Sequence, residues 1–180
     1  MTTLSAIQQT QNWVSDVIVG FNFCPFAKKE VVNNTIYYAD CQATQLEDAI
    51  VEMLALADKM KADEKIETCL QVFSAGFSDF NDFLDLIDLA NAMLASSGLE
   101  GFIQLANFHP DYVFADSTED DPANYTNRAP FPTLHLIREE SMARVLAVHP
   151  DPEGIPETNI SLAREKGQAF WVALLEKCRG

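Results

Sequence analysis

The feature that most constrains the fold is the regular alternation of helical and extended patterns along the chain. Apolar residues at helical spacing predict an amphipathic helix over residues 46–60, and a second over residues 78–98 with Ser78 as its N-cap. Short apolar runs around these helices predict strands at residues 36–38, 68–74, 101–108 and 133–137. An order of strand, helix, strand, helix, strand predicts parallel neighbours joined by right-handed crossovers.

Three further helices are predicted, over residues 4–19, 139–148 and about 158–178. The 180 residues contain no internal repeat and no low-complexity linker, so a single domain over residues 1–180 is expected. We therefore expect an α/β domain with a mixed sheet of about four strands, mainly parallel with one antiparallel strand, packed with helices.

The charge balance limits the classes of partner. The formal net charge is −15, from 27 acidic and 12 basic residues, which disfavours binding to nucleic acid. No apolar run approaches the ~20 residues of a membrane span, and the N-terminal residues do not resemble a signal peptide. The cysteines are widely spaced, which favours reduced thiols in a cytoplasmic protein and argues against a structural zinc site: Cys24, Cys41, Cys69 and Cys178.

The long connection at residues 110–132 is the first candidate for a functional site. Loops longer than ~12–15 residues are usually functional or disordered, and aromatic residues such as Tyr125 argue against disorder here. The loop follows the carboxyl end of a predicted strand, where α/β proteins bind ligands. His109 and Asp111 could act as an acid–base pair, and Arg128 could clamp an anionic group.

Three more residues are candidate ligand contacts at this edge. Tyr125 and Asn127 belong to the loop, and an antiparallel final strand would bring His135 to the same edge. The alternatives are structural: His109 caps its strand, Arg128 pairs with acids of the loop, and His135 is a satisfied histidine within a strand. A small anionic or polar metabolite is the ligand that this site would take, and no cofactor or oligomeric state is indicated.

Cys24 is the second candidate. Pro25 favours the first position of a helix, which would make Cys24 the N-cap of a short helix. Helix amides and the nearby lysines would then favour the thiolate and make the cysteine reactive. The alternative is a small buried apolar residue, as most free cysteines are.

The sequence carries two resemblances to known families. Cys24-Pro25-Phe26-Ala27 resembles the single-cysteine active site of omega-class glutathione transferases and monothiol glutaredoxin-like proteins. Over nearly the whole chain, the sequence resembles a bacterial family of uncharacterised proteins, domain of unknown function 1415. That resemblance rests on ordered motifs at residues 22–28, 81–85, 107–112, 124–132 and 149–152, and it implies no activity but adds His149 as a candidate or a turn residue.

Three hypotheses follow. The first is a cytoplasmic enzyme for a small polar or anionic metabolite, with His109 and Asp111 as acid–base residues and Arg128 binding the substrate. The second is a thiol-dependent transferase or reductase centred on Cys24. The third is a non-catalytic protein that binds a ligand or a partner.

Overall fold

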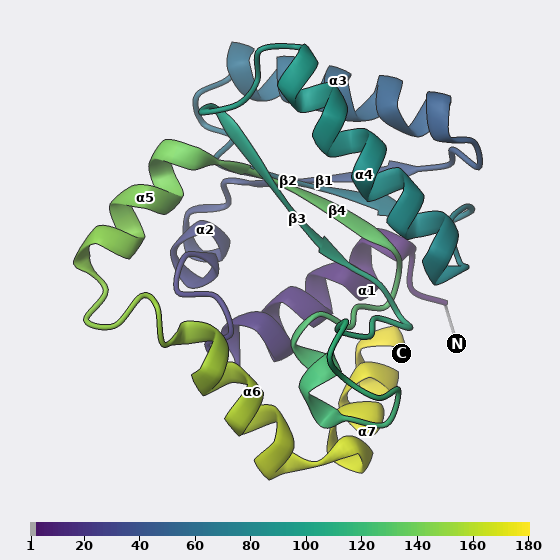
Figure 1. Ribbon diagram of the computed structural model, residues 1–180, viewed down its shortest axis with the longest axis vertical. Helices are drawn as coiled ribbons and strands as arrows, with labels where there is room; N and C mark the ends of the chain where they lie inside the picture. Colours follow the sequence, from purple (N-terminus) through teal and green to yellow (C-terminus); the bar gives the residue numbers. More distant parts are fainter. Residues whose placement is uncertain (1–2) are drawn as a thin grey trace.

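The computed structural model describes residues 3–180 and contains a mixed sheet with helices on both faces (Figure 1). The strands are β1 (Ile36–Cys41), β2 (Thr68–Phe73), β3 (Ile103–Phe108) and β4 (Thr133–Arg138). The α-helices are α1 (Ala6–Trp13), α2 (Ala27–Asn33), α3 (Leu46–Ala62), α4 (Phe80–Ser96), α5 (Glu139–Val148), α6 (Ile155–Lys166) and α7 (Gln168–Arg179). A π-helix, η1 (Val14–Val19), continues α1, and a short 3-10 helix, η2 (Pro122–Thr126), interrupts the long connection.

The strands are arranged in the order β1-β2-β4-β3. β1 pairs with β2 in parallel, and β4 pairs antiparallel with both β2 and β3. Three strands therefore run in one direction and β4 runs against them, which confirms the expected mixed sheet with one antiparallel strand. The expectation that successive strands are neighbours is wrong for β2 and β3, because the long connection after β3 returns the chain and inserts β4 between them.

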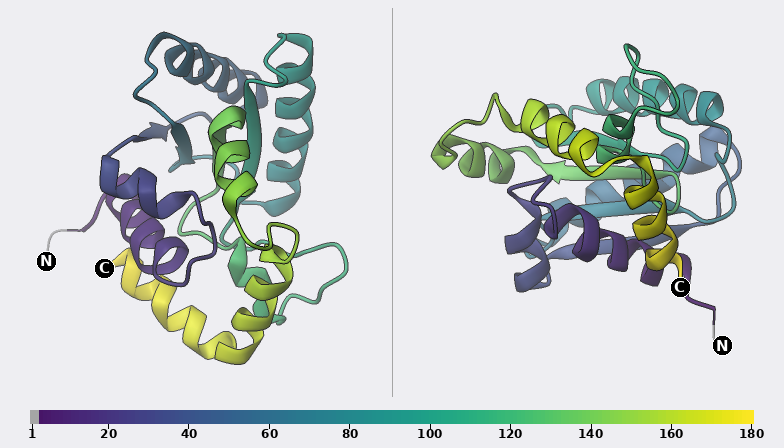
Figure 2. Two further views of the ribbon diagram at one scale, coloured as in Figure 1. Left: turned by 90° about the vertical axis from the view of Figure 1, so that its left-hand side faces the viewer. Right: turned by 90° about the horizontal axis from the view of Figure 1, so that it is seen from below.

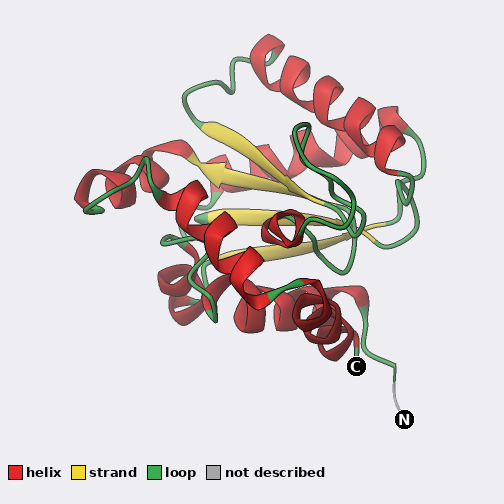
Figure 3. Cartoon of the chain, turned by 60° about the horizontal axis from the view of Figure 1, so that its bottom comes forward, coloured by secondary structure: helices red, strands yellow, loops and turns green. Residues whose placement is uncertain are grey.

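Alternate residues of the strands face two separate cores. On β2, Cys69 and Phe73 belong to the core beneath α3 and α4. Leu70 and Val72, the residues between, belong to the core formed with α1, η1 and α7. This period of two is what a sheet covered on both faces requires, and Figure 3 shows helices on both sides of the strands.

Two of the α-helices, α1 and α4, begin at side-chain caps. Ser5 and Gln8 form a reciprocal capping box at α1. The cap of α4 is Asp79, which accepts from the amides of Asn81 and Asp82, one residue beyond the expected Ser78. Within residues 3–180, no helix combines the length and the apolar character needed to cross a membrane.

The expected long helix at residues 158–178 is two helices. α6 ends and α7 begins at Gly167, whose φ of +79° lies in a region that glycine adopts without steric cost. The indole N–H of Trp171 donates to the carbonyl of Ala163 at 2.9 Å and ties the two helices across this corner. α7 therefore turns back against α1 rather than extending into solvent.

Candidate functional site

A cavity of about 520 Å³ lies against the face of the sheet that packs on α1 and η1. Its wall comes from the sheet, α1 and η1, the segment before α2, and α5 and α6. Most of the lining side chains are apolar, among them Ile18, Phe23, Met142, Leu146, Ile155 and Ile160. The volume falls in the range of about 300–1,000 Å³ that is usual for small-molecule sites.

The floor of the cavity is a row of residues across three strands. Leu70 on β2 is paired with His135 on β4, and His135 is paired with Ala106 on β3. All three line the cavity, because residues paired across neighbouring strands point to the same face. The methyl group of Ala106 fills little of the space above β3, which leaves room beside the imidazole.

His135 is neutral and keeps one ring nitrogen free. The Thr68 hydroxyl donates to the carbonyl of Leu136 at 2.7 Å, so Nε2 of His135 must donate to Thr68 Oγ1 at 2.5 Å. The network thus assigns the proton to Nε2 and leaves a lone pair on Nδ1, which makes no hydrogen bond to the described residues. Burial lowers the pKa of His135 to about 4.

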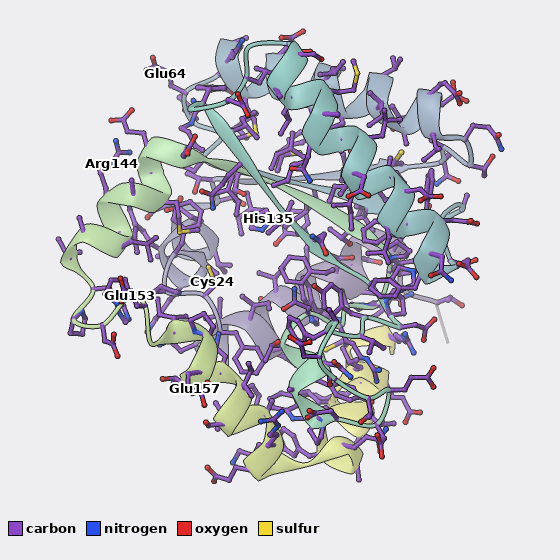
Figure 4. The ribbon with its side chains drawn as sticks, in the orientation of Figure 1. Cys24, Glu64, His135, Arg144, Glu153 and Glu157 are labelled. Carbon is purple, nitrogen blue, oxygen red and sulfur yellow. The ribbon has the colours of Figure 1, made fainter. Side chains whose placement is uncertain are left out.

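Cys24 lines the same cavity from the opposite side, in the segment before α2. The helix begins at Ala27 with Phe26 as its N-cap, so the expected N-cap position of Cys24 is wrong by two residues. Burial raises the pKa of the Cys24 thiol, and hydrogen bonds from the amides of Phe26 and Ala27 oppose the rise. The expected lowering of the pKa is therefore wrong in direction, because removal from water outweighs the amides. Figure 4 shows Cys24 near α2 and His135 on the sheet.

His109 does not line this cavity. Its side chain is fully buried, between the rings of Phe80 and Phe83 on α4. Nδ1 accepts from the amide of Asp111 at 3.0 Å, so Nε2 carries the proton and donates to the carbonyl of Phe77 at 3.0 Å. Both ring nitrogens are engaged, and the Asp111 residue meets the imidazole through its backbone rather than its exposed carboxylate.

The sequence His-Pro-Asp forms the same turn twice. At residues 149–151, Nδ1 of His149 accepts from the amide of Asp151 at 3.2 Å, as Nδ1 of His109 does from Asp111. A side chain that accepts from the amide two residues later is a local turn device. These contacts favour a turn-forming role for both histidines.

Arg128 holds the long connection together. Its Nε donates to the carbonyl of Tyr112 at 3.1 Å, its Nη2 donates to that of Glu119 at 2.9 Å, and its guanidinium lies 4.7 Å from the ring centre of Tyr125. Tyr125 is buried and stacks on Trp171. Neither Arg128 nor Tyr125 lines the cavity.

Of the expected loop residues, Asn127 is the one that reaches the cavity. Its side-chain Nδ2 donates to the backbone carbonyl of Asn107 at 3.2 Å. The backbone carbonyl of Asn127 accepts from the backbone amide of His109 at 3.1 Å. The structure thus brings Cys24, Asn127 and His135 to one cavity. It leaves the other four expected site residues, which are His109, Asp111, Tyr125 and Arg128, outside.

Two polar side chains in the cavity wall were not predicted. Glu30 is 1% exposed; its Oε2 accepts from the Thr35 hydroxyl, and its Oε1 has no hydrogen-bond partner among residues 3–180. Trp13 is also 1% exposed, and no residue of this described range accepts from its indole N–H. The sequence does contain a signal for Glu30. This residue follows Ala27 by three positions and Phe26 by four, and this spacing places it on the buried face of α2.

No set of three or more His, Cys, Asp or Glu side chains among residues 3–180 is arranged to hold a metal ion. The polar groups of the lining include the Cys24 thiol, the His135 imidazole, the Trp13 indole, two threonine hydroxyls, amides and the Glu30 carboxyl group. This chemistry suits hydrogen bonding or nucleophilic attack on a bound organic molecule.

Comparison with known proteins identifies a family. The model of the family described as "Protein of unknown function (DUF1415)" matches residues 5–173. Neither the curated proteins nor the solved structures contain a match. The resemblance of residues 24–27 to glutathione transferases and glutaredoxins gains no support from these comparisons.

Proposed function

Because the chain belongs to the DUF1415 family, whose description names no activity, we propose a function from the cavity: it binds a small, largely apolar molecule. The observation that carries this proposal is the cavity of about 520 Å³ with its mostly apolar wall. Apolar surface inside the cavity is removed from water when a ligand enters, at roughly 25 cal/mol per Å².

The wall disfavours the anionic metabolite expected from the sequence. No lysine or arginine of residues 3–180 lines the cavity, and Arg128 donates to two backbone carbonyls of its own loop. An anion inside would meet Glu30 and no cation. The acid–base role of His109 and Asp111 stays a prediction, and their contacts favour structural roles.

Binding of a neutral apolar dye such as Nile red tests the proposal. We expect saturable fluorescence enhancement with the wild-type protein. Ala106→Trp places an indole over the cavity floor and should weaken dye binding at least about tenfold, the equivalent of about 1.4 kcal/mol. Ala95→Trp is the matched control, because Ala95 is exposed on α4, which packs on the other face of the sheet. An unsaturable signal, or equal binding by both variants, contradicts the proposal.

Thiol chemistry at Cys24 is a second candidate, favoured by the shared cavity of Cys24 and His135. In an acyl transfer, the Cys24 proton would pass through a water molecule in the cavity to Nδ1 of His135 while the sulfur bonds to the carbonyl carbon of an acyl thioester. The departing thiolate would then take the proton from His135, which leaves the acyl group on Cys24. Neither an oxidant nor a cofactor is needed.

Mass spectrometry after incubation with an apolar acyl thioester tests this candidate. We expect acylation at Cys24 and none at the buried Cys69, and a fall of about 100-fold in rate in His135→Gln. Acylation at an unchanged rate in His135→Gln would exclude His135 as the base. The absence of acylation at Cys24 would exclude the whole scheme.

We also propose that the protein works in the cytoplasm and has no nucleic-acid partner. All four cysteines are free thiols, which suits a reducing compartment. A net charge of −15 repels phosphate backbones.

A further inference from the structure

We infer that the ligand of this cavity carries a polar end that donates hydrogen bonds, a hydroxyl or amino group rather than a carboxylate, and that Glu30 selects it. This inference rests on the proposed binding function and names the class of molecule that the cavity takes.

The carboxyl group of Glu30 is the strongest observation. The side chain is 1% exposed and forms part of the cavity wall, yet none of the described residues 3–180 donates a hydrogen bond to Oε1. Lys29 lies 3.8 Å from this oxygen, which is beyond hydrogen-bond distance, and the lysine side chain is 64% exposed. A buried carboxyl oxygen without a partner is unfavourable, because no hydrogen bond replaces its lost hydration, so a donor supplied by a ligand would be favoured there.

The other polar groups of the cavity point to the same class. Nδ1 of His135 offers a second lone pair and no proton. The lining includes no cationic side chain among residues 3–180, and the whole chain carries a net charge of −15. The indole N–H of Trp13 is a donor that finds no acceptor among residues 3–180, so a hydroxyl group, which both donates and accepts, suits it as well.

The positions of these residues give the ligand a direction. Trp13 and Glu30 belong to α1 and α2, whereas Met142, Leu146 and Ile160 belong to α5 and α6. In both views of Figure 2, α1 and α2 lie to one side of α5 and α6. The polar end of an amphipathic ligand therefore faces α1 and α2, and its apolar part faces α5 and α6.

Displacement of bound Nile red by three probes of equal chain length tests the inference: decan-1-ol, decan-1-amine and decanoate at neutral pH. We expect the alcohol and the amine to displace the dye at concentrations at least about tenfold below that of decanoate. Displacement by decanoate at an equal or lower concentration overturns the inference. So does dye binding that none of the three probes displaces. If the dye itself does not bind, the proposed function fails first.

Glu30→Gln should reduce the preference for the amine over decanoate at least about tenfold, because the buried carboxylate is replaced by a neutral amide of the same shape. Glu52→Gln removes the same charge from an exposed position on α3 and should leave the preference unchanged. Equal effects of the two variants would assign the preference to net charge and overturn the role of Glu30.

A surface variant keeps the test informative if Glu30→Gln does not fold. Lys29→Gln removes the cation that partly neutralises Glu30, so it should increase the preference for the amine severalfold. Lys28→Gln is the matched control, because Lys28 is also exposed and makes no ion pair among residues 3–180. An unchanged preference in Lys29→Gln contradicts the inference.

Discussion

Acidification should destabilise the fold through His135. Burial lowers its pKa from 6.5 to about 4 in the folded protein. Between these two values the unfolded chain binds a proton that the folded protein does not, so the free energy of unfolding rises with pH. The contribution of the neutral imidazole is fully present above the unfolded pKa and is lost as the pH falls from 6.5 towards 4.

The magnitude follows from the difference between the two pKa values. A difference of 6.5 minus about 4 is about 2.5 units, or about 3 kcal/mol at about 1.4 kcal/mol per unit. Between about pH 7 and about pH 4.5 most of this, about 2–3 kcal/mol, should be lost. His109 adds to the effect in the same direction, because burial also lowers its pKa.

Urea unfolding followed by tryptophan fluorescence over this pH range measures the effect. The wild type and His135→Gln share every other titrating group, so the difference between their free energies of unfolding isolates His135. That difference should shrink by about 2–3 kcal/mol on acidification. A His135→Gln curve parallel to the wild type refutes the reasoning.

Three further predictions concern stability, order and reactivity. His109→Ala should destabilise the protein by about 2–4 kcal/mol in urea unfolding, since it removes a buried ring with both nitrogens bonded; a loss under about 1 kcal/mol would argue for a functional role instead. Arg128→Ala should leave dye binding intact but expose residues 110–126 to limited proteolysis, which a protected loop would contradict. Cys24 should react with N-ethylmaleimide faster than Cys69, because burial within β2 raises the pKa of Cys69 to about 12. Bound dye should lower the reaction rate of Cys24, and equal rates at the two thiols would contradict this prediction.

The secondary structure could be predicted because it follows from local spacing. Every predicted strand is present, and on β2 the apolar residues alternate between two cores as their period requires. The break at Gly167 escaped prediction because apolar spacing continues across it, and one glycine within such a pattern is also compatible with a continuous helix. The position of β4 between β2 and β3 depends on non-local packing, which no local pattern records.

The candidate site was harder to predict, because the polar residues that stand out in the sequence form hydrogen bonds within the chain itself. The long connection carries the residues that looked most functional, yet Arg128 donates to loop carbonyls and His109 accepts from the amide two residues later. Cys24 was found because its local motif is distinctive. The apolar lining could not be predicted, because the same apolar residue types line a cavity and fill a core.

His135 shows how a cavity can nevertheless leave a trace in a sequence. Leu134 and Leu136 are buried beneath α3 and α4, so the histidine between them must face the opposite side of the sheet. That side is also covered by helices, so the imidazole needs a polar partner, open space or both. The partner is Thr68, which accepts from Nε2, and the space follows from Ala106, the small residue paired with His135 on β3. A histidine at an inward position of a sheet covered on both faces, beside a small residue, is therefore the pattern by which this cavity would be recognised.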